Sequence, residues 1–228
     1  MHIQDSISEM LSMQNALNEA TNGADWRSGL TLLGKAIDWR RCIVMESAEL
    51  IDSYPWKHWK SVDAQADMDN VRVELVDIWH FLLSLALENF EQPQAAELLA
   101  KALMDSGETE FELTKLAVID QVRIHETMMS IALQRTTVSA EYLTALAEAF
   151  FNSCKIAQLG FDQLYRIYMA KNVLNKFRQD HGYKEGTYIK EWSGQEDNVV
   201  MFEIIALMPS FSGDELYIRL KEAYSALR

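Results

Sequence analysis

Four acidic side chains stand out because each pair of them lies inside an apolar helical pattern. Glu46 and Glu49 belong to "ESAELIDSYPWKHWK", and Glu74 and Asp77 belong to "ELVDIWHF". Residues three apart on a helix are neighbours on one face, so the members of each pair project together. If the two helices pack antiparallel, the carboxylates meet. A close pair then repels by up to about 4 kcal/mol at an effective dielectric of roughly 20.

A bound cation or protonation relieves such repulsion in a partly buried site. Clustered carboxylates without sulfur ligands suit hard ions such as Mg²⁺ or Mn²⁺. The sequence therefore predicts a divalent metal site at these four acids.

Two other interpretations of the acids stay open. Each pair can be an ordinary solvated face of a helix. Asp77 and His80 also resemble half of the carboxylate–histidine pattern of di-iron bundles. That pattern needs a second such pair, and His125-Glu126 has the wrong order and spacing for it. Without that second pair, His80 is expected to lie in the wall of the site or beside its ligands, or to be a core histidine.

Positive charge gathers between residues 166 and 190, in a chain whose formal net charge is −13. Only Asp180 and Glu185 oppose the six basic side chains there, which are Arg166, Lys171, Lys176, Arg178, Lys184 and Lys190. By their spacing, Lys171, Asn175 and Arg178 share one face of a helix. The segment indicates either a site for a phosphorylated ligand or a basic surface helix.

Helices must position these side chains, because the hydrophobic pattern follows helical spacing along most of the chain. Only three prolines and nine glycines interrupt it, and no alternating stretch is long enough to demand a sheet. The expected fold class is therefore all-α, a helical bundle. The predicted helices span about 3–20, 35–53, 67–90, 109–135, 139–158, 161–179, 195–207 and 213–226, with a short one inside 91–110.

Finer features of these helices are also predicted. Asp67 or Asp69 is expected to cap the helix at 67–90. Residues 21–35 and the segment "GYKEGTYIKEWSGQED" (182–197) are expected to be loops, since glycines interrupt them. The apolar side of the helix at 35–53 is expected to consist of Ile37, Cys42, Val44, Met45, Ala48 and Ile51.

Length, composition and charge limit the number of domains, the binding partners and the cellular location that we expect. The chain has 228 residues, of which 49% are hydrophobic, enough for one large domain or two small ones. Its negative charge disfavours nonspecific binding to nucleic acid or to an anionic membrane. No signal-peptide pattern or long apolar run is present, so a cytoplasmic location is expected. Cys42 and Cys154 are expected to be free thiols.

Several of these segments resemble one family in the same order along the chain. They are "MLSMQNALNEATNG", "WRRCIVMESAELIDSYPWKHWK", "VRVELVDIWHFLLSLALE" and "KNVLNKFRQDHGYKEGTYIKEWSGQEDN", which together cover about half of the chain. They look like the dimeric deoxyuridine triphosphatases (dUTPases), members of the all-α nucleoside triphosphate pyrophosphatases. Residues 91–160 carry little of this resemblance.

The resemblance implies an enzyme and a reaction. It implies Mg²⁺-dependent hydrolysis of dUTP, and also of dUDP, to dUMP, by a homodimer. It also implies a single all-α domain over 1–228 with a divergent peripheral region at about 91–160. The metal ligands would be Glu46, Glu49, Glu74 and Asp77, and Glu46 or Glu49 would also orient and deprotonate the attacking water.

The resemblance further implies substrate-binding residues. Two amides at i, i+4 spacing, Gln14 and Asn18, would match the donors and acceptors at the edge of uracil. The remaining residues expected at the base and sugar are Trp56, Trp59, His80, Phe81 and Asn172. The residues expected near the phosphates are Lys57, Lys60, Lys171, Asn175, Arg178, Tyr183, Lys184 and Lys190.

Three rival functions stay open at this point. One is a related pyrophosphatase with another base preference, such as dCTP. The second is a noncatalytic helical binding protein, and the third is a di-iron carboxylate protein.

Overall fold

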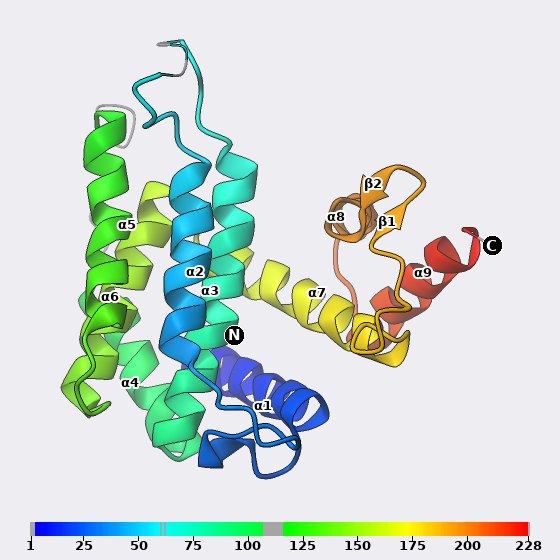
Figure 1. Cartoon of the computed structure of the whole chain (residues 1–228), viewed down its shortest axis with the longest axis horizontal. Coiled ribbons are helices and arrows are strands. Elements are labelled where there is room, and N and C mark those ends of the chain that lie inside the picture. Colours follow the sequence, from blue (N-terminus) through cyan, green and yellow to red (C-terminus); the bar gives the residue numbers. More distant parts are fainter. Residues whose placement is uncertain (1–2, 60, 62, 107–115, 228) are drawn as a thin grey trace. The chain divides into compact units, whose positions relative to one another are not determined.

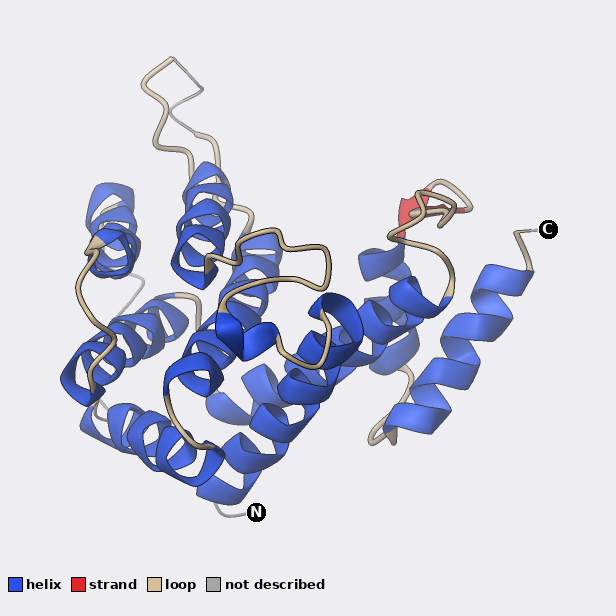
Figure 2. Cartoon of the chain, turned by 60° about the horizontal axis from the view of Figure 1, so that its bottom comes forward, coloured by secondary structure: helices blue, strands red, loops and turns tan. Residues whose placement is uncertain are grey.

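The computed structural model describes residues 3–59, 61, 63–106 and 116–227. The chain forms two compact units, Met1–Leu164 and Tyr165–Arg228. Helices dominate both units, and one two-stranded hairpin is present in the part of the chain that the structure describes (Figure 2). The all-α prediction is confirmed. The prediction of one domain over 1–228, with a divergent region at 91–160, stays a prediction.

The first unit is built around one buried helix. It contains α1 (Ile3–Asn22), the short turn η1 (Trp26–Ser28), α2 (Trp39–Asp52), α3 (Met68–Asn89), α4 (Gln92–Asp105), α5 (Val118–Leu133) and α6 (Ala140–Ile156). Helices α1, α2, α4 and α6 all pack against α3, and α5 packs against α2 and α6. Apolar residues surround α3 on most sides, which is the pattern of a core helix. Its Trp79 is fully buried and stacks on Phe150, with 5.1 Å between ring centroids.

Helices α2 and α3 run side by side and are the pair that carries the four acids (Figure 1). Each is preceded by an aspartate cap whose side chain accepts a hydrogen bond from a backbone N–H, at 3.0 Å in both cases. Asp38 accepts from Arg41 and Asp67 accepts from Asn70. The cap predicted for the helix at 67–90 is therefore Asp67. These caps fix where each helix starts, and thus which turn carries the acids.

The prediction for α2 was wrong in two respects. The helix begins at Trp39 rather than at 35, because Leu30 and Ala36 form an isolated bridge just before the Asp38 cap. Its buried stripe is also different, since Met45 and Ala48 are exposed. The buried residues are Trp39, Ile43, Ser47 and Leu50. Apolar residues occur on several sides of α2. Packing against α3 and α5, and not composition, therefore decides which side of the helix is buried.

The division between the units falls within α7 (Phe161–Asp180), whose residues from Tyr165 onward belong to the second unit. This unit also contains β1 (Glu191–Trp192), β2 (Gln195–Glu196), α8 (Asp197–Ala206) and α9 (Gly213–Ser225). Its core is aromatic. Phe177 of α7 is fully buried and lies against the rings of Trp192, Tyr217 and Tyr224 at centroid distances of 5.3 to 5.8 Å. These contacts hold the hairpin and α9 onto α7.

The hairpin corrects the prediction of a loop over 182–197. Trp192 pairs with Gln195 in an antiparallel register, so Ser193 and Gly194 form a two-residue turn. Both have positive φ, 54° and 86°, which is the backbone of a type I′ turn. The strands are only two residues long, so the sequence holds no alternating pattern that would predict them.

The helix predicted at 109–135 begins at Val118 in the structure. The part of that prediction over 109–115 lies outside the described residues. No helix among those described is long and apolar enough to cross a membrane.

A buried histidine makes the stability of the first unit sensitive to pH. His125 of α5 is fully buried, its Nε2 lies 3.0 Å from the hydroxyl of Tyr54, and burial lowers its pKa to about 4. The unfolded chain binds a proton near pH 6.5, so stability is lost as the pH falls from about 6.5 to 4. We expect the free energy of unfolding, measured in urea, to lose about 2 kcal/mol between pH 7 and pH 5 from this residue.

The variant His125→Gln should remove that loss, and the exposed His58 provides the matched control. His58→Gln should keep the wild-type pH dependence. An unchanged slope in His125→Gln would contradict the prediction.

Candidate functional site

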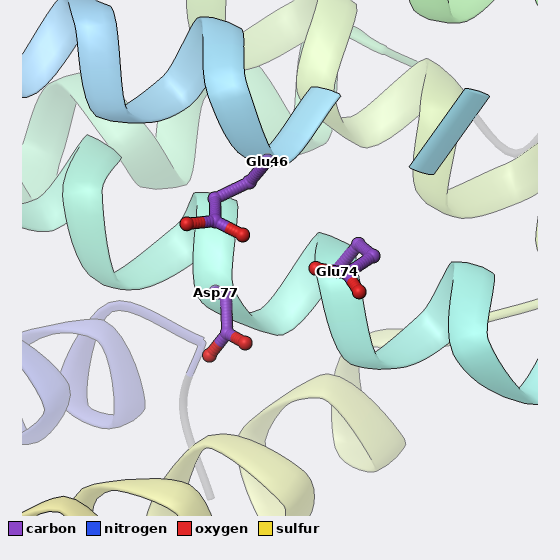
Figure 3. A group of neighbouring side chains, drawn as sticks. All are labelled: Glu46, Glu74 and Asp77. Carbon is purple, nitrogen blue, oxygen red and sulfur yellow. The ribbon is translucent and has the colours of Figure 1, made fainter. Parts of the chain in front are cut away.

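Three of the four predicted acids converge where α2 packs on α3. Glu46 comes from α2, and Glu74 and Asp77 come from α3 (Figure 3). One carboxylate oxygen from each lies within 4.8 Å of the others. Glu74 is 8% exposed, and the other two are half-buried. The sequence spacing thus does bring acids from two helices together.

The electrostatics of this cluster are unfavourable for three bare charges. Burial, the charges of Asp77, Glu74 and Glu49, and a hydrogen bond with Glu74 together raise the pKa of Glu46 to about 8. Three carboxylates with no sulfur or imidazole beside them form the donor set that hard divalent ions prefer. The residues therefore fit a cation such as Mg²⁺.

Glu49 lies one turn further along α2 and is exposed. Together with Glu74 it lines a cavity of about 430 Å³, whose other walls are Asp52, Ser53, Gln65, Asp67 and Asn70. The charge of Glu49 is close enough to raise the pKa of Glu46. Glu49 is thus beside the cluster, and its role as a ligand stays a prediction.

His80 is not part of the acid cluster. Its Nδ1 lies 2.8 Å from the carbonyl of Val76 in the preceding turn, to which it donates, and its side chain is buried. Among the described residues, the one group of three or more side chains arranged to hold a metal contains no histidine. This arrangement does not support the di-iron hypothesis.

The two predicted base-reading amides meet inside the first unit. Gln14 and Asn18 are each 3% exposed, and Gln14 Nε2 donates to Asn18 Oδ1 at 3.1 Å. Both also donate to the hydroxyl of Ser84 on α3, at 3.1 and 3.0 Å. They are therefore buried and hydrogen-bonded to each other rather than exposed polar residues of an N-terminal helix.

The aromatic residues predicted at the base and sugar are divided between two places. Phe81 stacks on Trp39, with 6.2 Å between ring centroids. Trp56 and Trp59 contact each other edge-on and are 45% and 64% exposed. Lys57 lies over the Trp56 ring and forms an ion pair with Asp52. Lys60 lies outside the described residues.

In the second unit, a buried ion pair fixes one of the predicted phosphate residues. Arg178 donates to both oxygens of Asp197 at 2.8 Å, and Asp197 is 0% exposed. Tyr188 donates its hydroxyl to the same carboxylate at 2.7 Å. Burial alone would raise the pKa of Asp197. The hydrogen bonds and charge of Arg178 outweigh that effect and hold it below its usual range.

Neighbouring side chains extend this arrangement. The side-chain oxygen of Asn198 accepts from Lys171 at 3.1 Å and from Arg178 at 3.3 Å, and Asn175 accepts from Arg178 at 3.1 Å. Asn172 donates to the hydroxyl of Tyr168 at 3.2 Å. Lys171, Asn175 and Arg178 thus share a face of α7, as their spacing predicts.

The remaining predicted phosphate residues lie after α7. The guanidinium of Arg178 lies 5.9 Å from the ring centre of Tyr183, which is 48% exposed. Lys184 is exposed, and Lys190 is exposed and pairs with Glu196. That these residues meet the acid cluster of the first unit stays a prediction.

Three residues that were not predicted from the sequence hold predicted site residues in place: Ser84, Asp197 and Asn198. Ser84 follows Asp77 by seven residues and therefore lies on the same helix face, a spacing that could have revealed it. Asp197 and Asn198 are the first residues of α8 and look in the sequence like an ordinary polar helix start. Nothing in the pattern therefore indicates the burial of Asp197 or the contacts of Asn198.

Comparison with known protein families identifies a match. A family model described as dUTPase matches residues 6–183, which is more than half of the chain. No curated protein matches the chain. The matched range includes all four acids, both amides and the basic face of α7.

Proposed function

Because the chain belongs to the dUTPase family, we propose that it hydrolyses dUTP, and also dUDP, to dUMP with the help of Mg²⁺ held by the cluster of Glu46, Glu74 and Asp77 together with the neighbouring Glu49. Family membership makes the protein a dUTP diphosphatase. The cation, the use of dUDP and the roles of single residues are our proposal. The observation that carries it is the convergence of three carboxylates within 4.8 Å in the family's matched range.

The acids of α2 and α3 are proposed to serve the phosphate end of the substrate. A divalent cation at such a site polarises phosphoryl oxygens, neutralises developing negative charge and lowers the pKa of a bound water. We assign ligation to Glu46, Glu74, Asp77 and the neighbouring Glu49. We assign to Glu46 or Glu49 the additional task of orienting the attacking water and accepting its proton, since a carboxylate can do both in one place.

The basic residues of the second unit are proposed to bind the phosphates. Arg178 and Lys171 are held on one face of α7 by neutral and acidic acceptors, so little side-chain freedom remains to be lost on binding. Tyr183, Lys184 and Lys190 lie in the segment after α7, and closure of such a segment over a ligand excludes water. Lys57 and Lys60 are proposed to bind phosphate as well.

The base and sugar are proposed to lie against the buried amides and aromatic rings. Gln14 and Asn18 supply hydrogen bonds for the uracil edge, and Trp56 and Trp59 supply ring faces. Phe81 lies one turn beyond Asp77, and a ring there would disfavour a ribose 2′-hydroxyl. His80 and Asn172 complete the proposed set. The homodimer and the cytoplasmic location stay predictions, the first of which light scattering measures directly.

A turnover assay with a panel of nucleotides tests this proposal. Release of pyrophosphate or phosphate is measured with dUTP, dUDP, dCTP, dTTP and UTP, with Mg²⁺, with Mn²⁺ and after chelation. We expect dUTP to be the best substrate, Mn²⁺ to replace Mg²⁺ in part, and chelation to abolish turnover. Faster turnover of dCTP than of dUTP would overturn the base assignment, and full activity after chelation would overturn the metal assignment.

A further inference from the structure

A buried hydroxyl joins the two amides that the proposed function places at the base. Ser84 of α3 is 0% exposed and accepts hydrogen bonds from Gln14 Nε2 and Asn18 Nδ2. It lies two turns after Asp77, on the same face of the helix. The helix that carries two of the metal ligands therefore also contacts the amides of α1.

A backbone group sets the direction of the hydrogen bonds in this cluster. The Ser84 hydroxyl has a single proton and lies 2.8 Å from the carbonyl oxygen of His80, but 3.4 Å from Asn18 Oδ1. The hydroxyl donates its proton in the shorter contact, to the carbonyl of His80. Ser84 Oγ can therefore only accept hydrogen bonds from the two amides. Asn18 must then turn its Nδ2 toward Ser84 and its Oδ1 toward the N–H of Gln14, which lies 3.1 Å away.

The opposite orientation of the Asn18 amide loses both contacts. A flipped amide would place its N–H against the N–H of Gln14. It would also place its carbonyl oxygen against a serine oxygen whose proton is already donated. Both groups are buried, where unmade hydrogen bonds are costly. Ser84 and Gln14 together therefore hold Asn18 in one of its two amide orientations.

Amide orientation decides between uracil and cytosine. Uracil offers an N3–H donor and an O4 acceptor, whereas cytosine offers an N3 acceptor and an amino donor at the same places. A fixed amide presents its donor and acceptor at fixed positions and suits one of these bases. A freely flipping amide suits either.

We infer that Ser84 is a positioning residue that makes the enzyme selective for uracil over cytosine by locking the orientation of Asn18. This inference rests on the proposed placement of the base at Gln14 and Asn18. It adds to that placement a residue that touches no substrate and acts through Asn18.

The test is the ratio of kcat/KM for dUTP to kcat/KM for dCTP, measured with both nucleotides in competition. We expect Ser84→Ala to lower this ratio by about tenfold, the value of one hydrogen bond near the upper end of its range. The ratio does not depend on how much of the variant is folded, because both substrates compete for the same active molecules. In an Asn18→Ala background, Ser84→Ala should lower the ratio no further.

Ser47→Ala is the matched control. Ser47 is also 0% exposed and donates to the carbonyl four residues earlier, Ile43, at 2.7 Å, but it lies on α2. It should keep the wild-type ratio. If Asn18→Ala leaves the ratio unchanged, the base placement in the proposed function is wrong. If Asn18→Ala lowers it while Ser84→Ala does not, only the role of Ser84 is wrong.

Discussion

Replacing Asp77 by asparagine is expected to lower kcat for dUTP by about a thousandfold, equivalent to about 4 kcal/mol of lost transition-state stabilisation. Asparagine keeps the size of the side chain but removes the charge that draws a cation to the cluster of Glu46, Glu74 and Asp77. Steady-state turnover at saturating Mg²⁺ measures the effect, and Glu46→Gln should behave similarly.

The same substitution should leave the fold intact or stabilise it. Removing one of three carboxylates within 4.8 Å relieves repulsion in the metal-free protein, so the urea midpoint of Asp77→Asn should equal or exceed that of the wild type. Asp69→Asn is the matched control on α3. Asp69 is an exposed partner of Arg72, and its loss should leave kcat unchanged. A kcat within tenfold of wild type for Asp77→Asn would contradict the metal assignment.

Replacing Asp197 by alanine is expected to destabilise the second unit by about 3–5 kcal/mol. The substitution leaves the guanidinium of Arg178, only 12% exposed, without the carboxylate that accepts two of its hydrogen bonds. Tyr188 loses the acceptor of its hydroxyl at the same time. Urea unfolding followed by tryptophan fluorescence, to which Trp192 in the core of this unit contributes, measures the loss.

A surface ion pair of the same unit supplies the comparison. Arg219 and Glu222 on α9 are more than half exposed and lie 3.4 Å apart. Such pairs contribute about 0–1 kcal/mol, so Glu222→Ala should leave the unfolding transition almost unchanged. If Asp197→Ala costs no more than Glu222→Ala, the buried pair is not what anchors α8 on α7.

The sequence predicts the helices of this protein well because local signals mark their ends. Asp67 begins α3 as a cap, the segment after Gly160 begins α7, and a Tyr54-Pro55 step follows the end of α2 at Asp52. The convergence of acids was also predictable, since spacing of three on two neighbouring helices brings side chains together once the helices pack.

What the sequence could not supply depends on tertiary packing. The buried stripe of α2 contains Ser47, whose hydroxyl donates a hydrogen bond to the carbonyl of Ile43. A polar residue therefore occupies a core position, which the hydrophobic pattern does not predict. The partners Ser84, Asp197 and Asn198 lie 66, 19 and 27 residues from Asn18, Arg178 and Lys171. No local pattern encodes contacts of that kind.

Helix α3 places core residues and proposed ligands in the same turns, with Glu74 and Asp77 interleaved among Leu75, Val76 and Ile78. Any change that repacks one side of this helix also shifts the carboxylates on the other. Efforts to make the enzyme more heat-resistant should therefore leave α3 untouched. Helix α9 exposes much of its surface and carries none of the proposed site residues, so it offers room for substitution.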